Sequence, residues 1–308
     1  MNIFRGLDDI APPPSSSVIA IGNFDGVHLG HQQILSLLEQ RACKRDTASF
    51  ALTFFPHPRQ VLGSTPLPLI QTLEQRLERM EEFGIQNAVI LKFEKRFSHI
   101  PAIDFIQDII SRSLQAREII VGDNFSFGRD REGDVRALRR FQRRFDYRVY
   151  SVPAVVRGGV LVSSSNIRQL LCEGRMLEAS KLLGRPYRIS GPVISGHSKG
   201  RSLGFPTANI QSTNDILPPG VFITETELEG SSFPSLTNIG SRPTFNGEEL
   251  SVETHLIGEN ADFYGKKLTV LFHQKIRDEI RFDSSEALAV RIQADISTAR
   301  AYFDRLFS

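Results

Sequence analysis

The chain has 308 residues, 40% hydrophobic and 23% charged, and 37 basic against 35 acidic side chains leave a formal charge of +2. This composition excludes a disordered chain, which carries fewer apolar residues and a larger net charge, and a length above roughly 250 residues favours two domains. The near-neutral charge argues against a dedicated duplex-binding protein, and no apolar run approaches the roughly 18–20 residues of a membrane helix.

The chain start and the cysteines bear on location. Residues 1–9 contain no basic segment followed by an apolar stretch, so we expect no signal peptide. Cys43 and Cys172 are too few for a disulfide framework or a cysteine-ligated metal site, and they fit a reducing compartment. We therefore expect a soluble cytoplasmic protein, a monomer or weak homo-oligomer, with no membrane and no nucleic-acid partner.

Short β-branched runs alternate with helical patterns in the first half of the chain. The expected elements, in order, are a strand at 17–21, a helix at 32–45, a strand at 50–54, a helix at 72–83, and strands at 88–91, 119–121 and 148–150. Strands that alternate with helices predict a parallel sheet covered on both faces. Ligands of such sheets bind at the carboxyl ends of the strands.

The pattern changes after about Gly184. Alternating strands are expected at 221–226, 250–256 and 268–272, separated by Gly, Pro and Asn, which predicts a small antiparallel barrel or sandwich. A final helix opens at Ser284. The boundary is placed near Arg185, so we expect an α/β domain at 1–185 and a β domain with a terminal helix at 186–308.

The first candidate site is the glycine-rich turn GNFDGVHLGH at 22–31. Its glycines let the backbone pass close to a ligand, and the helix start offers unpaired N–H groups. The turn has neither the GK[ST] triplet of a Walker loop nor the glycine spacing of the dinucleotide fingerprint. His28 and His31 beside a helix start suit the stabilisation of charge on a transferring phosphorus. A metal pair and a purely structural role are the alternatives.

The second candidate site lies at 191–209. Three glycines and two cations in its loop can wrap a triphosphate, although an ordinary β-turn is the alternative; these residues are Gly196, Lys199, Gly200, Arg201 and Gly204. Thr207 and Asn209 share one face of an extended segment, and their oxygens are hard ligands suited to Mg²⁺. In strand 250–256 the apolar residues share one face, so Glu253 is turned toward a ligand or solvent.

These segments carry a family resemblance. Residues 22–31 resemble the GxFDGxHxGH signature of HxGH nucleotidyltransferases, and 196–209 resembles the riboflavin kinase pattern GxxxGRxLGFPTAN. With TFFPHP at 53–58, VGDNFSFG at 121–128 and VSSSNIR at 162–168 in the expected order, the chain resembles the bacterial bifunctional riboflavin kinase/FMN adenylyltransferase family over nearly its whole length. The resemblance implies a Rossmann-like nucleotidyltransferase domain followed by a β-barrel riboflavin kinase domain.

The resemblance also implies two ATP-dependent reactions with Mg²⁺. The barrel domain would phosphorylate riboflavin to FMN, and the first domain would transfer AMP to FMN, giving FAD and pyrophosphate. It assigns phosphate contacts to His28, His31 and Arg168, metal and ATP to Thr207 and Asn209, and the base that deprotonates the ribityl hydroxyl to Glu253. The other substrate-binding positions that it implies are Gly22, Asn23, Phe24, Asp25, Gly30, Pro56, His57, Asn124, Phe125, Ser164, Gly196, Lys199, Gly200, Arg201, Gly204, Phe205, Pro206 and Arg277.

The sequence departs from the family pattern in one motif. Ser165 and Asn166 stand where the family usually has threonine and arginine. A riboflavin kinase with a weakened or inactive adenylyltransferase half is therefore one alternative, and a non-catalytic flavin- or nucleic-acid-binding protein is another. The arginine-rich segment 129–148 is interpreted as a solvated helix face, with a role in gripping nucleotide phosphates or a partner surface as alternatives.

Overall fold

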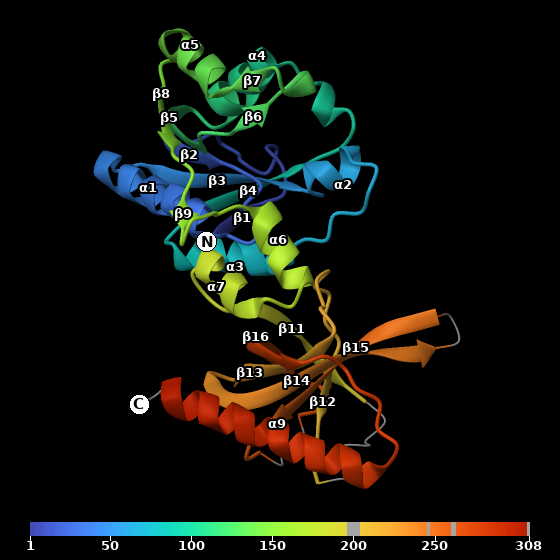
Figure 1. Cartoon of the computed structure of the whole chain (residues 1–308). Coiled ribbons are helices and arrows are strands. Elements are labelled where there is room, and N and C mark those ends of the chain that lie inside the picture. Colours follow the sequence, from blue (N-terminus) through green and yellow to red (C-terminus); the bar gives the residue numbers. More distant parts are fainter. Residues whose placement is uncertain (196–203, 245–246, 260–262, 307–308) are drawn as a thin grey trace. The chain divides into compact units, whose positions relative to one another are not determined.

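The structure is a computed structural model that describes residues 1–195, 204–244, 247–259 and 263–306. The chain forms two compact units (Figure 1). The first unit contains residues 1–68 and 72–164, and the second unit contains residues 69–71 and 165–308.

A parallel sheet forms the centre of the first unit (Figure 1). Its strands are β1 (Asn2–Phe4), β2 (Ser17–Ile21), β3 (Ala48–Phe55), β4 (Asn87–Lys92), β5 (Ala116–Gly122) and β8 (Arg148–Val152). The strand order is β1-β4-β3-β2-β5-β8, and every neighbouring pair is parallel. The predicted parallel sheet is confirmed, and β1 is an edge strand that the sequence pattern does not indicate.

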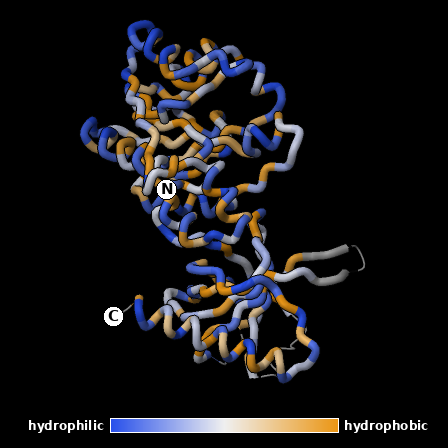
Figure 2. The backbone as a smooth tube through the Cα atoms, in the orientation of Figure 1, coloured by the Kyte–Doolittle hydropathy of each residue, from blue (hydrophilic) through white to orange (hydrophobic). Residues whose placement is uncertain are grey.

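Helices cover both faces of this sheet. Side chains alternate between the faces of a strand, so Val18 and Ala20 pack against α1 (Leu29–Arg45) and α3 (Leu73–Glu82). Ile19 and Ile21 face the other side. That side is covered by α4 (Ala102–Asp104), the π-type segment η2 (Phe105–Ser113) and α5 (Val135–Phe145). Figure 2 shows the hydrophobic residues concentrated in the strands of the sheet.

Short elements complete the first unit. They are α2 (Pro58–Leu62), η1 (Phe97–His99), β6 (Ser126–Phe127), η3 (Arg129–Arg131), β7 (Gly133–Asp134), β9 (Val156–Arg157) and β10 (Val160–Leu161). Helix α5 turns its apolar residues Val135 and Leu138 into the core. Its opposite face carries exposed arginines, in agreement with the solvated helix face indicated by the sequence: Arg136, Arg139, Arg140, Arg143 and Arg144.

The second unit is a closed antiparallel barrel with helices. Its strands are β11 (Tyr187–Ile194), β12 (Ala208–Ile210), β13 (Gly220–Leu228), β14 (Ser231–Thr244), β15 (Gly247–Leu256) and β16 (Lys267–Arg277), in the order β11-β12-β15-β14-β13-β16. Helix α6 (Ser164–Cys172) leads into this unit, α7 (Met176–Leu183) lies within it, and α9 (Ser285–Leu306) packs on the barrel through Ile296, Ala299 and Phe303. The expected small β domain with a terminal helix is confirmed as a barrel.

Candidate active sites

The histidine turn follows β2 at the point where the direction of the sheet connections changes. From β2 the chain continues to β3 on one side, whereas β5 lies on the other side. In open parallel sheets the crevice at such a switch point, at the carboxyl ends of the strands, is the usual ligand site. Gly22 begins the turn and donates its N–H to the carbonyl of Leu52, 3.1 Å away.

The backbone of this turn is strained. Phe24 and Val27 have φ angles of 51° and 37°, and Gly26 has 85°. A positive φ is unfavourable for side chains other than glycine, most of all for a β-branched residue such as valine. Such residues persist where the surrounding structure holds them, and they gather at functional sites.

Side chains from three other segments bind the carbonyls of the turn. The three hydrogen bonds are Thr53 Oγ1 to Asn23 O at 3.0 Å, Ser164 Oγ to Asp25 O at 2.8 Å, and Gln32 Nε2 to Val27 O at 2.9 Å. Strand β3, the start of α6 and helix α1 therefore all fix the same turn. Ser164, one of the predicted site residues, is brought directly to it.

His28 and His31 form a stacked pair at the start of α1. The ring centroids are 3.7 Å apart with 13° between the planes, and the edge of Phe24 lies against His31 at 5.3 Å. His28 is the N-cap of α1, and its Nδ1 accepts the backbone N–H of His31 at 3.3 Å. This cap starts the helix at Leu29, three residues before the predicted position, and places both rings at the positive end of the helix dipole.

The surroundings of His31 keep its imidazole uncharged. Burial, followed by the charges of His28 and Arg76, holds the pKa of His31 well below 6.5. Its Nδ1 is buried and has no hydrogen-bond partner among the described residues. A neutral imidazole still carries one ring N–H, which can donate a hydrogen bond to a phosphate oxygen.

Arg76 is a residue of this region that the sequence interpretation missed. It is completely buried, with Nη1 donating to Thr53 Oγ1 at 3.0 Å and to the carbonyl of Phe54 at 3.2 Å. Burial lowers the pKa of Arg76, and the charge of Asp25 opposes this effect. The available signal was spacing, because Arg76 lies between Leu73 and Met80 at i+3 of an apolar helix stripe.

The segments predicted to contact the flavin follow the neighbouring strands at the same sheet edge. His57, after β3, is buried and caps α2 by accepting the N–H of Arg59 at 3.1 Å, while Pro56 before it is exposed. Asn124, after β5, is exposed, and Phe125 stacks on Phe127 at 5.4 Å. Arg168 is largely buried on α6 in the second unit.

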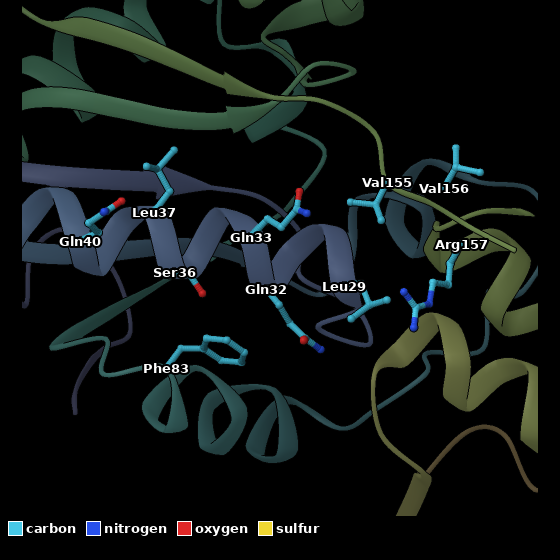
Figure 3. A pocket seen from close by; sticks show the side chains of 10 residues that line it. All are labelled: Leu29, Gln32, Gln33, Ser36, Leu37, Gln40, Phe83, Val155, Val156 and Arg157. Atoms are coloured by element: carbon cyan, nitrogen blue, oxygen red, sulfur yellow. The ribbon is translucent and has the colours of Figure 1, made fainter. Parts of the chain in front are cut away.

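A groove of about 830 Å³ runs along the outer side of α1 (Figure 3). It starts at Leu29, and Phe83 and the segment 155–157 form its other walls. Its lining is mostly amide and apolar, with Arg157 as its charged residue, so it lacks the cations that a polyphosphate requires. None of the predicted site residues lines it, and we therefore place the candidate site at the histidine turn.

The second site is assembled on two neighbouring strands of the barrel. The hydroxyl of Thr207 lies 3.5 Å from a carboxylate oxygen of Glu253. Asn209 on β12 stands opposite Glu253 on β15, and Asn238 on β14 stands opposite it on the other side. Thr207 and Glu253 are 46 residues apart in the sequence. The barrel nevertheless brings these two residues and Asn209 together.

The alternation predicted for the strand at 250–256 is present. It begins at Val252: Val252, Thr254 and Leu256 are buried and Glu253 and His255 are half-buried on the other face, but Leu250, expected on the packed face, is 46% exposed. Nδ1 of His255 lies 2.8 Å from the carbonyl of Pro206, and the ring of Phe205 meets His255 edge-on. This contact fixes the segment that precedes Thr207.

The remaining predicted residues of the second site are Arg277 and those of the glycine-rich loop. Arg277 is engaged by Asp295, with Nε and Nη2 each 2.9 Å from the buried carboxylate. Gly204 adopts a φ of 83°, which favours glycine. The loop residues Gly196, Lys199, Gly200 and Arg201 lie outside the described residues.

Two family models match the chain. The model described as FAD synthetase matches residues 11–166, and the model described as riboflavin kinase matches residues 183–303. The two ranges correspond to the histidine turn with its sheet and to the barrel.

Curated relatives match over nearly their whole length. A protein of Pseudomonas fluorescens described as bifunctional riboflavin kinase/FMN adenylyltransferase is 38% identical over 303 residues, which cover 98% of this chain and 97% of the relative. A protein of Escherichia coli K12 with the same description is 35% identical over 307 residues, covering 98% of each chain.

A solved structure is similar over both units. A crystal structure described as a macrolide-efflux protein from Streptococcus pneumoniae has a TM-score of 0.88 at 29% identity, and the match covers 97% of this chain and 98% of that one. In the part of the present chain that the structure describes, no helix is long and apolar enough to cross a membrane.

Proposed function

Because the chain belongs to the bifunctional riboflavin kinase/FMN adenylyltransferase family, we propose that each of its two reactions is carried out by a separate part of the chain. The enzyme uses ATP to phosphorylate riboflavin to FMN and then to adenylylate FMN to FAD. Residues 186–308 carry the kinase reaction and residues 1–185 the adenylyl transfer. The ranges matched by the two family models support this division.

In the kinase reaction Glu253 acts as the general base. Its carboxylate accepts the proton of the riboflavin 5′-hydroxyl while the hydroxyl oxygen attacks the γ-phosphorus of ATP and ADP leaves. The half-buried position of Glu253 and its neighbour Thr207 at 3.5 Å support this role. Phosphoryl transfer depends mainly on positioning and charge stabilisation, which two adjacent strands provide by fixing both residues.

The residues beside Glu253 fit a magnesium ion. Thr207, Asn209 and Glu253 offer hydroxyl, amide and carboxylate oxygens, and Mg²⁺ takes a few such ligands together with waters and phosphate oxygens. Among the described residues no cluster of three His, Cys, Asp or Glu side chains competes as a metal site. Thr207 and Asn209 would hold the ion, which would neutralise charge on the ATP phosphates when bound.

In the adenylyl transfer the histidine turn binds the phosphates of ATP. A phosphate oxygen of FMN attacks the α-phosphorus, and pyrophosphate leaves as the bond to its bridging oxygen breaks. The nucleophile is already anionic, so the reaction needs no protein base. His28, His31 and the start of α1 stabilise the charge on the transferring group. Asn124, Phe125 and the Pro56–His57 turn border the flavin.

One observation carries this proposal: each unit holds its own set of phosphate-directed groups. The stacked histidines lie at the switch point of the sheet, and the Thr207–Glu253 pair lies on the barrel. Both reactions use ATP and flavins, so we also propose a cytoplasmic enzyme, a monomer or weak homo-oligomer, that needs neither a membrane nor a nucleic-acid partner.

A time course tests the function. Riboflavin, ATP and Mg²⁺ are incubated with the full chain, and riboflavin, FMN and FAD are separated by chromatography. We expect FMN to accumulate first and FAD to follow. FMN without FAD would indicate a kinase whose adenylyltransferase half is weakened, as the Asn166 departure allows. The formation of neither product would indicate a non-catalytic binding protein.

A further inference from the structure

Arg76 is a buried cation bound to the strand that flanks the histidine turn. It ranks among the largest fully buried side chains of the described chain. Only Nη1 makes hydrogen bonds, while Nε and Nη2 are buried without a partner among the described residues. A buried guanidinium with unused donors is costly, because a buried charge is stabilised only by partners and hydrogen bonds. Its presence here therefore calls for a functional reason.

A two-step hydrogen-bond chain connects Arg76 to the turn. Arg76 Nη1 donates to Thr53 Oγ1 at 3.0 Å, and Thr53 Oγ1 donates to the carbonyl of Asn23, also at 3.0 Å. A hydroxyl can donate only one proton, and an arginine side chain cannot accept a hydrogen bond. Thr53 therefore accepts from Arg76 and donates its proton to the carbonyl of Asn23. Asn23 immediately precedes the strained residue Phe24.

The charge of Arg76 also acts on the functional groups of the turn. Asp25, which is completely buried, interacts favourably with it. Burial, His28 and Arg76, in that order, lower the pKa of His31. Arg76 and His31 therefore lie close enough together for the positive charge of one to influence the other.

We propose, on the basis of the adenylyl transfer proposed above, that Arg76 is a positioning residue for that reaction. It holds the histidine turn through Thr53 and adds a fixed positive charge beside the histidines that bind the triphosphate. It does not touch the substrate. A preorganised charge in a water-excluded site favours an anionic transition state more strongly than the same charge in water.

Three substitutions distinguish the effect of the Arg76–Thr53 hydrogen bond from the effect of the positive charge of Arg76. Arg76→Met removes both, Thr53→Val breaks the link and keeps the charge, and Arg76→Lys keeps the charge without the planar guanidinium. Arg79→Met is the matched control, because the half-buried Arg79 lies on the same helix and pairs with Glu82, without a hydrogen bond to β3 or to the histidine turn among the described residues.

We expect Arg76→Met to lower the kcat of FAD formation from FMN by about 100-fold, and Arg76→Lys and Thr53→Val to lower it by about 10-fold, since misplacement of a catalytic group costs factors of this size. Phosphorylation of riboflavin by the same preparations is expected to be unchanged. Arg79→Met is expected to match the wild type in both reactions.

The pH profile of FAD formation distinguishes this role from a merely structural one, which would leave the profile unchanged. Loss of the Arg76 charge raises the pKa of His31, so the acid limb of FAD formation shifts to higher pH in Arg76→Met. It stays in place in Arg76→Lys and Thr53→Val, which keep the charge near His28 and His31. The phosphate of FMN titrates in the same range, but it does so equally in every variant.

Wild-type FAD formation with an unshifted acid limb in Arg76→Met would overturn the inference. An equal loss of both reactions in that variant indicates a folding defect, and the two milder variants then decide. If Arg76→Met does not fold, full FAD formation by Arg76→Lys and Thr53→Val contradicts the proposal. Failure of the wild-type chain to make FAD from FMN would instead refute the proposed function.

Discussion

At the scale of single residues, Glu253 is the clearest case in which sequence spacing predicts chemistry. Its position between buried residues of one strand turns its carboxylate away from the packed face, and the barrel then places it beside Thr207. The sequence could not predict this contact, because Thr207 and Glu253 are 46 residues apart and meet only through the pairing of β12 with β15.

Replacement of Glu253 by glutamine tests its role as a base. The amide keeps the shape of the side chain but cannot accept the proton of the hydroxyl, so we expect FMN formation to fall by about 10²- to 10⁴-fold. FAD formation from added FMN is expected to be unchanged. Steady-state rates of both reactions measure this, and a parallel loss of FAD formation would contradict the assignment of one reaction to each part of the chain.

Replacement of His31 by alanine tests the other site. The change removes the neutral imidazole that is stacked on His28, so we expect FAD formation to fall by about 10²- to 10³-fold while riboflavin phosphorylation continues. His99→Ala is the control, because His99 is an exposed histidine on η1 in the same unit. Equal effects of the two substitutions on FAD formation would argue against a role for His31.

At the histidine turn, the sequence predicted the histidine pair and a following helix, which starts three residues earlier than expected, but not Arg76. Histidines and glycines after a buried strand form a local signal, readable within ten residues. Arg76 contributes through tertiary contacts with β3, and an arginine on a helix is ordinarily expected to be exposed. Only its position in the apolar stripe distinguished it.

At the scale of elements, the sequence predicted a strand whose buried side chains are apolar and missed a strand whose buried side chains are polar. Strand β2 was predicted with its observed bounds because all five of its residues are buried. Strand β14 (Ser231–Thr244) was missed, since its inward positions carry hydroxyls. Four of the hydroxyl residues inside the barrel are completely buried and hydrogen-bonded to one another at 2.8–2.9 Å: Thr224, Ser235, Thr237 and Thr254. A hydroxyl-lined interior gives no hydrophobic alternation for a sequence pattern to follow.

A buried ion pair joins α1 to β5. Glu118 on β5 is fully buried and accepts hydrogen bonds from Arg41 and Arg45 at 2.5–2.6 Å. We expect Glu118→Gln to lower the opening free energy of this sheet by roughly 2 kcal/mol, because it leaves buried donors without a charged acceptor. Hydrogen exchange of the β5 amides measures this. Asp108→Asn, in an exposed pair with Arg112, is expected to change it by at most a few tenths of a kcal/mol.

The same pair gives the sheet a pH dependence. Burial raises the pKa of Glu118, but the hydrogen bonds from Arg41 and Arg45 outweigh this effect and leave the pKa below 4.5. The stabilisation is therefore fully present above pH 4.5 and is lost as the pH falls through the folded-state pKa. Protection of the β5 amides should decline on acidification in the wild type and decline less in Glu118→Gln; identical declines would contradict this assignment.

At the scale of the whole molecule, length was informative and net charge was not. A chain of 308 residues leaves room for two cores, and the two compact units and the two family models match that expectation. A charge of +2 says little about an enzyme for anionic substrates. In the first unit a helix start, which adds nothing to a charge count, and a single buried arginine act locally beside the histidines, so the net charge of the chain does not reveal them.

The separation of the two sites predicts that they can act on different copies of the chain. Glu253→Gln retains the histidine turn, and His31→Ala retains the Thr207–Glu253 pair, because each pair of residues lies in a different unit. Each full-length variant alone should fail to convert riboflavin to FAD, whereas a mixture should restore the conversion, because FMN made by one copy diffuses to the other. Chromatography should show a lag in FAD that shortens as the concentration of the His31→Ala variant rises. A mixture that makes no FAD, although Glu253→Gln makes FAD from added FMN, would mean that the kinase site of the His31→Ala copy does not release its FMN to solution.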